Sequence, residues 1–464
     1  MFLPALARFV PGRIQSSARS FHGVLALPRA RSVAVSSLVA RLPKGMVPLA
    51  MVLLLHQVTG SYALAGLTAA LVAAGDAAST PLQGRLIDRV GRGWVLIPTA
   101  AVHVTAVAAL LLLARAHGPA WALAASAGVA GIGMPPVSGS IKAVWPQLTA
   151  PGRVAEAYTI ESLLQQVVFL AGPLLVALLA GTSGPAAALA CSAGMVLAGN
   201  IWFTAATAGL AGRAAGRPRS GTARWGRDAR ILVGCTLMQG LIFGALPVGL
   251  AAVTAAARLP SLAGVLQAAT TVGGLTGTFA LAVTASRRGY VRVTTAFAVA
   301  LVPAAVLATA PSAPVLAALG ASLAAAGLFV TPVAAVSYVL MERAASPAHR
   351  TEAFAWLSTG LAVGTAAGSG LAGLLAGWAG PAAALAVGPA AAGLSALLGT
   401  LLRGAGHRTA RRHSPSPPVF RQRIPGQAGR CRITMIAAAS RNAEAASSQP
   451  SSIAWKVWYR LPGW

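Results

Sequence analysis

The sequence predicts an all-α polytopic membrane protein, with twelve transmembrane helices arranged as two halves of six. Three observations support this prediction. Of the 464 residues, 56% are hydrophobic and only 9% are charged, whereas soluble domains carry about 25% charged residues. The apolar residues form runs of about 20 or more, the length with which a helix crosses a bilayer. The basic residues concentrate in alternate connections between these runs.

Twelve apolar spans are expected between residues 32 and 403. Helices of this length satisfy their own backbone hydrogen bonds, which a lipid environment requires. Short connections containing Gly, Pro or charge separate the spans, as at Gly184-Pro185 and Gly380-Pro381. The expected spans are residues 32–57, 61–83, 93–115, 119–141, 157–181, 184–208, 230–255, 260–284, 291–309, 313–341, 352–376 and 381–403.

The distribution of Lys and Arg predicts the orientation. The N-terminal tail and one set of alternate connections hold 21 of these residues, and the other set holds only Arg115 and Arg258. Because cytoplasmic connections carry the excess of positive charge, we expect both termini in the cytoplasm and a multi-pass protein of the plasma membrane. The formal net charge is +28, but the basic residues form no folded basic domain, so no nucleic-acid partner is expected.

The chain is expected to have five parts. Residues 1–31 contain no acid and predict a disordered basic tail, although a transit peptide has a similar composition. Residues 404–464 are rich in Arg, Ser and Pro and also predict disorder. The expected parts are the basic tail (1–31), an N-terminal six-helix half (32–208), a cytoplasmic linker rich in Gly and Arg (209–229), a C-terminal six-helix half (230–403) and the second tail (404–464).

An internal repeat supports the two halves. When residues 136–181 are aligned with residues 332–377 without gaps, fourteen of 46 positions are identical. The identical pairs include Pro136 with Pro332 and Glu156 with Glu352, which runs of Ala and Leu do not explain. Duplicated six-helix halves are an arrangement known in transporters.

A charged segment follows the second span. Residues 84–92 read Gly-Arg-Leu-Ile-Asp-Arg-Val-Gly-Arg, and Asp88 is one of only eight acidic residues in the chain. Gly84 and Gly91 are expected to let the backbone turn. Three basic residues surround Asp88 and can pair with it: Arg85, Arg89 and Arg92. A merely basic cytoplasmic loop is the alternative interpretation.

This segment resembles the connection between helices 2 and 3 in the major facilitator superfamily of secondary transporters. That pattern is Gly, three variable residues, Asp-Arg, one variable residue and Gly-Arg. The resemblance implies that Asp88 acts in a latch that meets the start of helix 11, near Thr351-Glu352. In the fifth span, Gly172-Pro173 resembles an element of exporters of the superfamily, although Leu174 stands where further glycines are usual. A packing kink is the alternative for this element.

Charged residues inside apolar spans are costly and are therefore candidates for function. Arg41 and Lys44 lie in the first span and Asp76 in the second. At 1.5 Å per residue the three lie at similar depths, so we expect them to meet in a proton or substrate site. A static ion pair between the two helices is the alternative. In the fifth span, Glu161 and Gln165 are four residues apart and share a helical face, and a snorkelling surface Glu161 is the alternative.

The sequence thus predicts a secondary active transporter that works by alternating access, with proton-coupled export of a small molecule as the leading form. Nutrient uptake, or a membrane receptor or assembly partner without transport, are the alternatives. Enzyme motifs and a nucleotide-binding loop are missing from the sequence, so we expect no enzyme activity, cofactor or metal site. The expected partners are the substrate, protons and lipid, with the protein a monomer.

Overall fold

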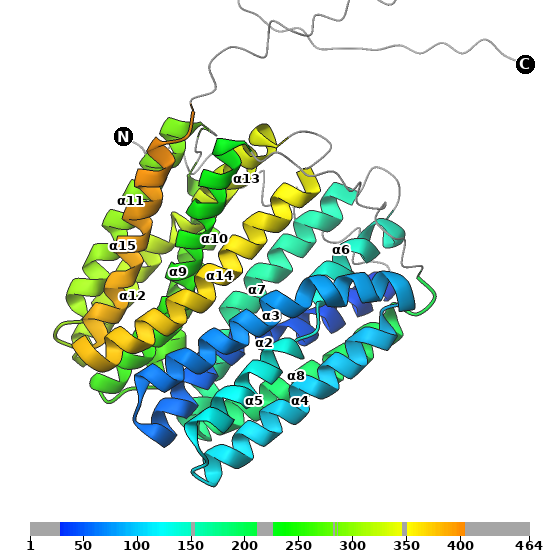
Figure 1. The fold of residues 1–464 in the computed structure, drawn as a ribbon, viewed down its shortest axis with the longest axis horizontal. Helices are drawn as coiled ribbons and strands as arrows, with labels where there is room; N and C mark the ends of the chain where they lie inside the picture. Colours follow the sequence, from blue (N-terminus) through cyan, green and yellow to red (C-terminus); the bar gives the residue numbers. More distant parts are fainter. Residues whose placement is uncertain are drawn as a thin grey trace, which may run out of the picture. The chain divides into compact units, whose positions relative to one another are not determined.

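We analysed a computed structural model of the chain (Figure 1). The structure describes residues 28–149, 154–210, 226–281, 284, 286–345 and 350–403. Most of the expected N-terminal tail and linker and the whole expected tail 404–464 lie outside the described residues. The division of the chain at the predicted domain boundaries therefore stays a prediction there.

Every regular element among the described residues is an α-helix. The N-terminal half contains α2 (Pro28–Thr59), α3 (Tyr62–Val90), α4 (Gly93–Arg115), α5 (Ala120–Ile132), α6 (Val137–Leu148), α7 (Val154–Thr182) and α8 (Pro185–Ala206). The C-terminal half contains α9 (Arg227–Ala256), α10 (Leu262–Ala280), α11 (Arg287–Leu307), α12 (Ala313–Gly327), α13 (Val330–Ala344), α14 (Arg350–Ala379) and α15 (Pro381–Thr400).

These helices occupy the positions of the twelve expected spans. Eleven segments of the described chain are long and apolar enough to cross a membrane, with α5–α6 and α12–α13 each counted as one segment. The twelfth position is α10, in which Gly and Thr alternate with the apolar residues. The prediction of an all-α polytopic membrane protein is therefore confirmed.

The predicted fourth span, residues 119–141, ended too early. Lys142 suggested a connection, but α6 continues to Leu148 with one apolar face inside the protein. Ile141, Val144 and Trp145 are buried while Lys142 is exposed, which is the spacing of an amphipathic helix.

The fourth span is broken between α5 and α6. The break follows Ile132 and contains Pro135 and Pro136, and neither proline can donate to a helical hydrogen bond. Side chains from neighbouring helices take over as partners of the freed carbonyls. Gln83 Nε2 of α3 donates to the carbonyl of Ile132 at 2.7 Å, and His103 Nδ1 of α4 lies 2.7 Å from the carbonyl of Ala130.

The two halves repeat one turn. Gly184 precedes α8 with φ = 87°, and Gly380 precedes α15 with φ = 84°. Both values lie in the left-handed region, where glycine is favoured, and a Pro at the first helical turn follows each glycine. The separators expected at Gly184-Pro185 and Gly380-Pro381 are therefore equivalent turns, as an internal repeat requires.

The apolar core has a different organisation at the two ends of the bundle. We call the end where α2 begins and α15 finishes the terminal end, and the opposite end the far end. At the far end a single buried cluster contains residues of both halves, such as Leu49 and Val72 with Val248 and Ala372. At the terminal end each half has a separate cluster, one around Trp145 and one around Tyr290.

Backbone contacts close the far end between the halves. A Cβ built on Gly66 of α3 would lie 2.5 Å from the Ser369 carbonyl oxygen and 2.7 Å from the Gly373 Cα of α14. Between α7 and α10, a Cβ on Gly264 would overlap the carbonyl of Pro173. Figure 1 shows α3 and α14 close together at one end and spread apart toward the other.

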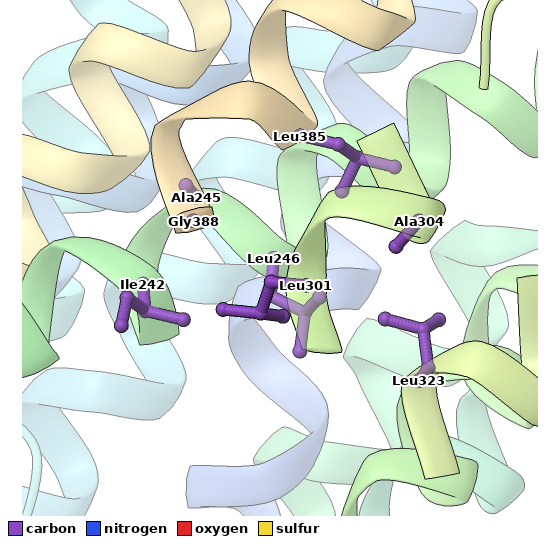
Figure 2. Close-up of a pocket in the computed structure, with 8 residues that line it drawn as sticks. All are labelled: Ile242, Ala245, Leu246, Leu301, Ala304, Leu323, Leu385 and Gly388. Carbon is purple, nitrogen blue, oxygen red and sulfur yellow. The ribbon is translucent and has the colours of Figure 1, made fainter. Parts of the chain in front are cut away.

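A small void lies inside the C-terminal half (Figure 2). Its volume is about 10 Å³, near the minimum that holds one water, and Figure 2 shows only apolar side chains around it. It is therefore a packing gap. The lining residues are Ile242, Ala245, Leu246, Leu301, Ala304, Leu323, Leu385 and Gly388.

Gly388→Ala should raise the stability of the folded protein. A Cβ at this buried position of α15 would meet Leu301 Cδ1 at 3.6 Å, an ordinary contact, and Ala is favoured over Gly in a helix by about 1 kcal/mol. The expected result is a higher midpoint of thermal unfolding in detergent micelles. Gly393→Ala is the matched control, because nothing lies within 4 Å of its Cβ. Equal shifts for both variants would show that filling the void contributes nothing.

Candidate functional site

The charged residues that lie deep inside the described helices belong to the N-terminal half. They form two ion pairs, Arg41 with Glu161 and Lys44 with Asp76. In the C-terminal half, the charged residues of the described helices lie within two turns of a helix end. Because charge inside a membrane marks functional positions by default, we take these two pairs as the candidate site.

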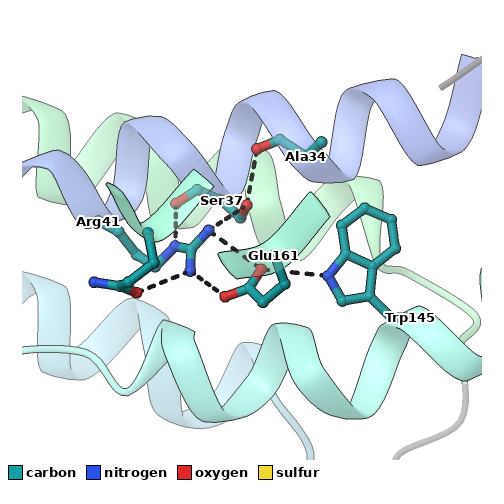
Figure 3. Close-up of polar contacts among 6 residues, drawn as sticks. Ala34, Ser37, Arg41, Trp145 and Glu161 are labelled. Atoms are coloured by element: carbon teal, nitrogen blue, oxygen red, sulfur yellow. Dashed lines mark hydrogen bonds and ion pairs between the residues drawn. The ribbon is translucent and has the colours of Figure 1, made fainter. Parts of the chain in front are cut away.

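The Arg41–Glu161 pair is buried. The side chains are 0% and 5% exposed, and Arg41 Nη1 and Nη2 donate to the two carboxylate oxygens of Glu161 (Figure 3). Trp145 Nε1 also donates to Glu161 Oε2, at 3.3 Å. Each charge therefore has a direct counter-charge and further hydrogen bonds, the condition under which a buried pair is tolerated.

The remaining Arg41 donors also have partners. Nε donates to the Ser37 carbonyl at 3.1 Å, and Nη2 lies 3.4 Å from Ser37 Oγ. Nη1 lies 3.4 Å from Gln165 Oε1. The guanidinium is thus held on all sides, which gives Arg41 a fixed position between α2, α6 and α7.

Helical spacing explains this arrangement. On α2, Arg41 and Gly45 are four residues apart, and on α7, Glu161, Gln165 and Gly172 lie on one face. A Cβ on Gly172 would lie 2.8 Å from the Gly45 backbone, so α2 and α7 touch through glycines at this point. That close approach brings the two faces together and places Glu161 against Arg41.

The Lys44–Asp76 pair lies between α2 and α3 and is more accessible. Lys44 Nζ lies 3.1 Å and 3.4 Å from the two carboxylate oxygens of Asp76, and the side chains are 23% and 30% exposed. Thr80 Oγ1 also donates to Asp76 Oδ1, at 3.2 Å. Asp76 is therefore the only charged partner of Lys44 among the described residues, whereas Asp76 has another polar neighbour.

The expected meeting of three residues takes a different form. Lys44 and Asp76 meet, because they are equally distant along the chain from the turn at Gly60. Arg41 instead points to α7 and pairs with Glu161 and Gln165. The snorkelling alternative required Glu161 to reach the surface. Glu161 is only 4% exposed and does not reach it.

The charged segment 84–92 is mostly helical, contrary to the predicted turn at Gly84. The helix α3 continues to Val90, and a Cβ at Gly84 would meet nothing within 4 Å. The turn is confined to Gly91, with φ = 94°, and Arg92, which is 8% exposed. Gly84 was misjudged because a glycine in a helix near its end has the same sequence signature as one in a turn.

Asp88, Arg85 and Arg89 are exposed at the terminal end of α3. No hydrogen bond or ion pair of Asp88 is found within the described part of the chain. The side chains of the expected latch partners, Thr351 and Glu352, lie outside the described residues. The latch therefore stays a prediction.

Gly172-Pro173 connects the two halves. Gly172 contacts Gly45 of α2, and the Pro173 carbonyl lies against Gly264 of α10. Thr271 Oγ1 of α10 also donates to the Phe169 carbonyl of α7, at 3.2 Å. The element is thus a site of close helix packing, the role that small residues have in membrane helices.

Sequence reasoning missed Trp145, Ser37 and His103 at the site. The Trp145 indole N–H is the only polar group of that side chain, so a buried Trp near an acid was a usable signal. For Ser37, the spacing of four residues from Arg41 was the available signal. His103 is fully buried, and no sequence pattern indicated that its ring would lie against the Ala130 carbonyl of α5.

The C-terminal half offers polar and aromatic groups without charge. Gln239 Nε2 donates to Ser337 Oγ at 3.2 Å within the buried part of that half. Tyr338 is 48% exposed and pairs with the ring of Phe354 at a centroid distance of 6.0 Å.

Comparisons with known proteins extend this picture to the fold. No family model and no curated protein matches the chain, but solved structures do. A nucleoside transporter NupG mutant has a TM-score of 0.63 at 14% identity, covering 80% of this chain and 97% of that one. A bacterial homologue of the iron transporter ferroportin in an inward-facing state has a TM-score of 0.62 at 18% identity, covering 80% of this chain and 97% of that one. A bacterial ferroportin homologue in an outward-facing state has a TM-score of 0.54 at 19% identity, covering 81% of this chain and 99% of that one. The chain therefore shares the fold of these solved transporter structures.

Proposed function

We propose that this protein is a proton-coupled secondary transporter of a small molecule and that it works by alternating access. The observation that supports the proposal most is the accessible Lys44–Asp76 pair inside a membrane helix bundle. A carboxylate at such a position binds and releases protons, and embedded acids in pumps and transporters serve as proton relays. The buried Arg41–Glu161 pair beside it would act as the fixed frame.

Alternating access requires two arrangements of the halves. In this structure the far end is closed by a shared core, while the terminal end has two separate cores. Positive charge in the terminal connections supports a cytoplasmic terminal end. The site would then face the cytoplasm in this state, and separation of α3 from α14 at the far end would expose it to the other side.

Export by proton antiport, the leading form from the sequence, stays a prediction that rests on the Gly172-Pro173 element. The packing of this element against α10 gives it a part in the contact between the halves. Uptake remains the second form. The proposal also includes a location in the plasma membrane, both termini in the cytoplasm and a monomeric protein.

The test is flux in vesicles that contain the full-length protein, with a proton gradient of either direction. The probes are a matched set with one aromatic ring: benzenesulfonate, benzyltrimethylammonium and benzyl alcohol. At least one probe should move faster than in empty vesicles, and Asp76→Asn should remove the dependence on the proton gradient. Arg115→Gln, which removes an exposed charge at the end of α4, should transport like the wild type. Absence of any protein-dependent flux would overturn the proposal.

A further inference from the structure

We propose that the transported substrate is a small organic anion, that Lys44 binds its negative group, and that a proton enters Asp76 at the same time. This inference rests on the proposed transport function. It deepens that function by naming the class of substrate and by moving substrate and proton in the same direction, which favours uptake, the second form above, over export by antiport.

Lys44 and Asp76 differ in the partners that each side chain has. Within the described residues, the Lys44 ammonium has the Asp76 carboxylate as its charged partner at 3.1 Å. Asp76 additionally accepts from Thr80 Oγ1. When the pair separates, Asp76 keeps a donor and can be neutralised by a proton, whereas Lys44 is left needing an anion. A ligand that replaces Asp76 at Lys44 must therefore bring negative charge.

The helices packed around Asp76 carry few titratable groups. Lys44 faces it from α2, and the titratable residues of α4 are the buried His103 and, at its end, Arg115. The helix α5 carries no charged residue, and α9 carries charge only in its first turn, at Arg227, Asp228 and Arg230. In α14 the charged residues are Arg350 and Glu352, at its start.

The net charge of the site differs between its states of occupancy. The empty site is neutral, because two cations face two carboxylates. A proton alone gives the site a charge of +1, an anion alone gives −1, and both together restore neutrality. When both ends close around the site, uncompensated charge is strongly disfavoured. The empty state and the state with both anion and proton should therefore change conformation most easily.

A cationic substrate fits this site less well. A cation on Asp76 leaves the Lys44 ammonium without a counter-charge and places two positive charges together, for a net charge of +1. The empty site would still be neutral and would change conformation without cargo, which wastes the gradient in an antiporter. Transport of the proton and the anion in the same direction fits the two neutral states, the empty site and the site with both bound.

Binding to the purified full-length protein tests this inference. The probes are the three compounds of the flux test and their naphthalene counterparts, at pH 5.5–8 in weakly buffered detergent solution. Because the sulfonates and quaternary ammonium probes keep their charge in this range, any proton taken up enters the protein. Calorimetry gives the affinity, and a pH indicator gives the protons taken up.

The sulfonates should bind with uptake of about one proton each, and their affinity should fall as the pH rises because a proton is bound with the anion. Lys44→Gln should weaken sulfonate binding about 10-fold to 100-fold, the loss expected for one charged hydrogen bond. Asp76→Asn, which mimics the protonated acid, should bind sulfonates without proton uptake and without pH dependence. Arg115→Gln is the matched control and should behave as wild type. Lys44→Arg keeps the positive charge and should therefore retain sulfonate binding. This result would show that Lys44→Gln weakens binding through the loss of charge and not through misfolding.

Three results would overturn the inference: binding of the ammonium probes with proton release, sulfonate binding that Lys44→Gln leaves unchanged, or no binding by any sulfonate. None of these results decides the transport proposal, which fails only if the vesicles show no protein-dependent flux.

Discussion

Glu161→Gln should destabilise the folded protein by about 3–5 kcal/mol, because the substitution leaves the Arg41 charge buried without a counter-charge. The amide is nearly the same size and can still accept from Trp145 and Arg41, so the effect isolates charge from shape. Unfolding in mixed micelles with increasing denaturing detergent measures it. The Arg41 side chain is 0% exposed, so solvent cannot screen the loss.

The control for this prediction is the removal of both charges. Arg41→Met combined with Glu161→Leu should recover most of the lost stability, because well-packed apolar residues often replace a buried pair without loss. Gln165→Leu, which removes only a contact of 3.4 Å, should cost about 1 kcal/mol or less. A double variant that is as unstable as Glu161→Gln would show that the charge balance is not the cause.

Gly373→Ala should shift the protein away from the state with a closed far end and abolish most transport. A Cβ at this position would lie 2.6 Å from the Tyr62 carbonyl oxygen and 2.8 Å from the Gly66 Cα. Backbone cannot move aside as a flexible side chain can, so α3 and α14 must separate. The other state, in which they are expected to be apart, should tolerate the methyl group.

Labelling of a single cysteine checks the shift. In a background with Cys191→Ser, Cys235→Ser and Cys431→Ser, Leu82→Cys places the one thiol on α3 at a position that is 64% exposed at the terminal end. Its reaction with a membrane-impermeant maleimide should slow when Gly373→Ala is added. Gly370→Ala is the matched control on the same helix, since its Cβ meets only Ala70 Cβ at 3.8 Å. Equal slowing in both variants would contradict the prediction.

The fold could be predicted because the length and apolarity of each span identify it almost without reference to the other spans. Errors arose where a helix has mixed composition, as in α6, whose polar residues lie on one exposed face. The predicted turn at Gly84 was wrong for a related reason, because glycine permits a turn but does not require one. The break at Pro135-Pro136 also needed neighbours that no local pattern reveals, namely Gln83 and His103.

The charged residues of the candidate site could be predicted, but not which of them pair with each other. Depth along each helix placed Arg41, Lys44 and Asp76 near one another, and Glu161 with Gln165 on one face. The partner of each charge depends on which helix lies on either side of α2. Arg41 and Lys44 are three residues apart, yet one faces α7 and the other α3. That arrangement is set by long-range packing, including the contact of Gly45 with Gly172.

The core shared by both halves at the far end has a consequence for folding cooperativity. A cluster that contains Leu49, Val72, Val248 and Ala372 makes the stability of each half depend on the other while that end is closed. The two halves should then melt in one transition. A condition that holds the far end open leaves only the separate clusters around Trp145 and Tyr290, and each half then becomes its own unit of unfolding.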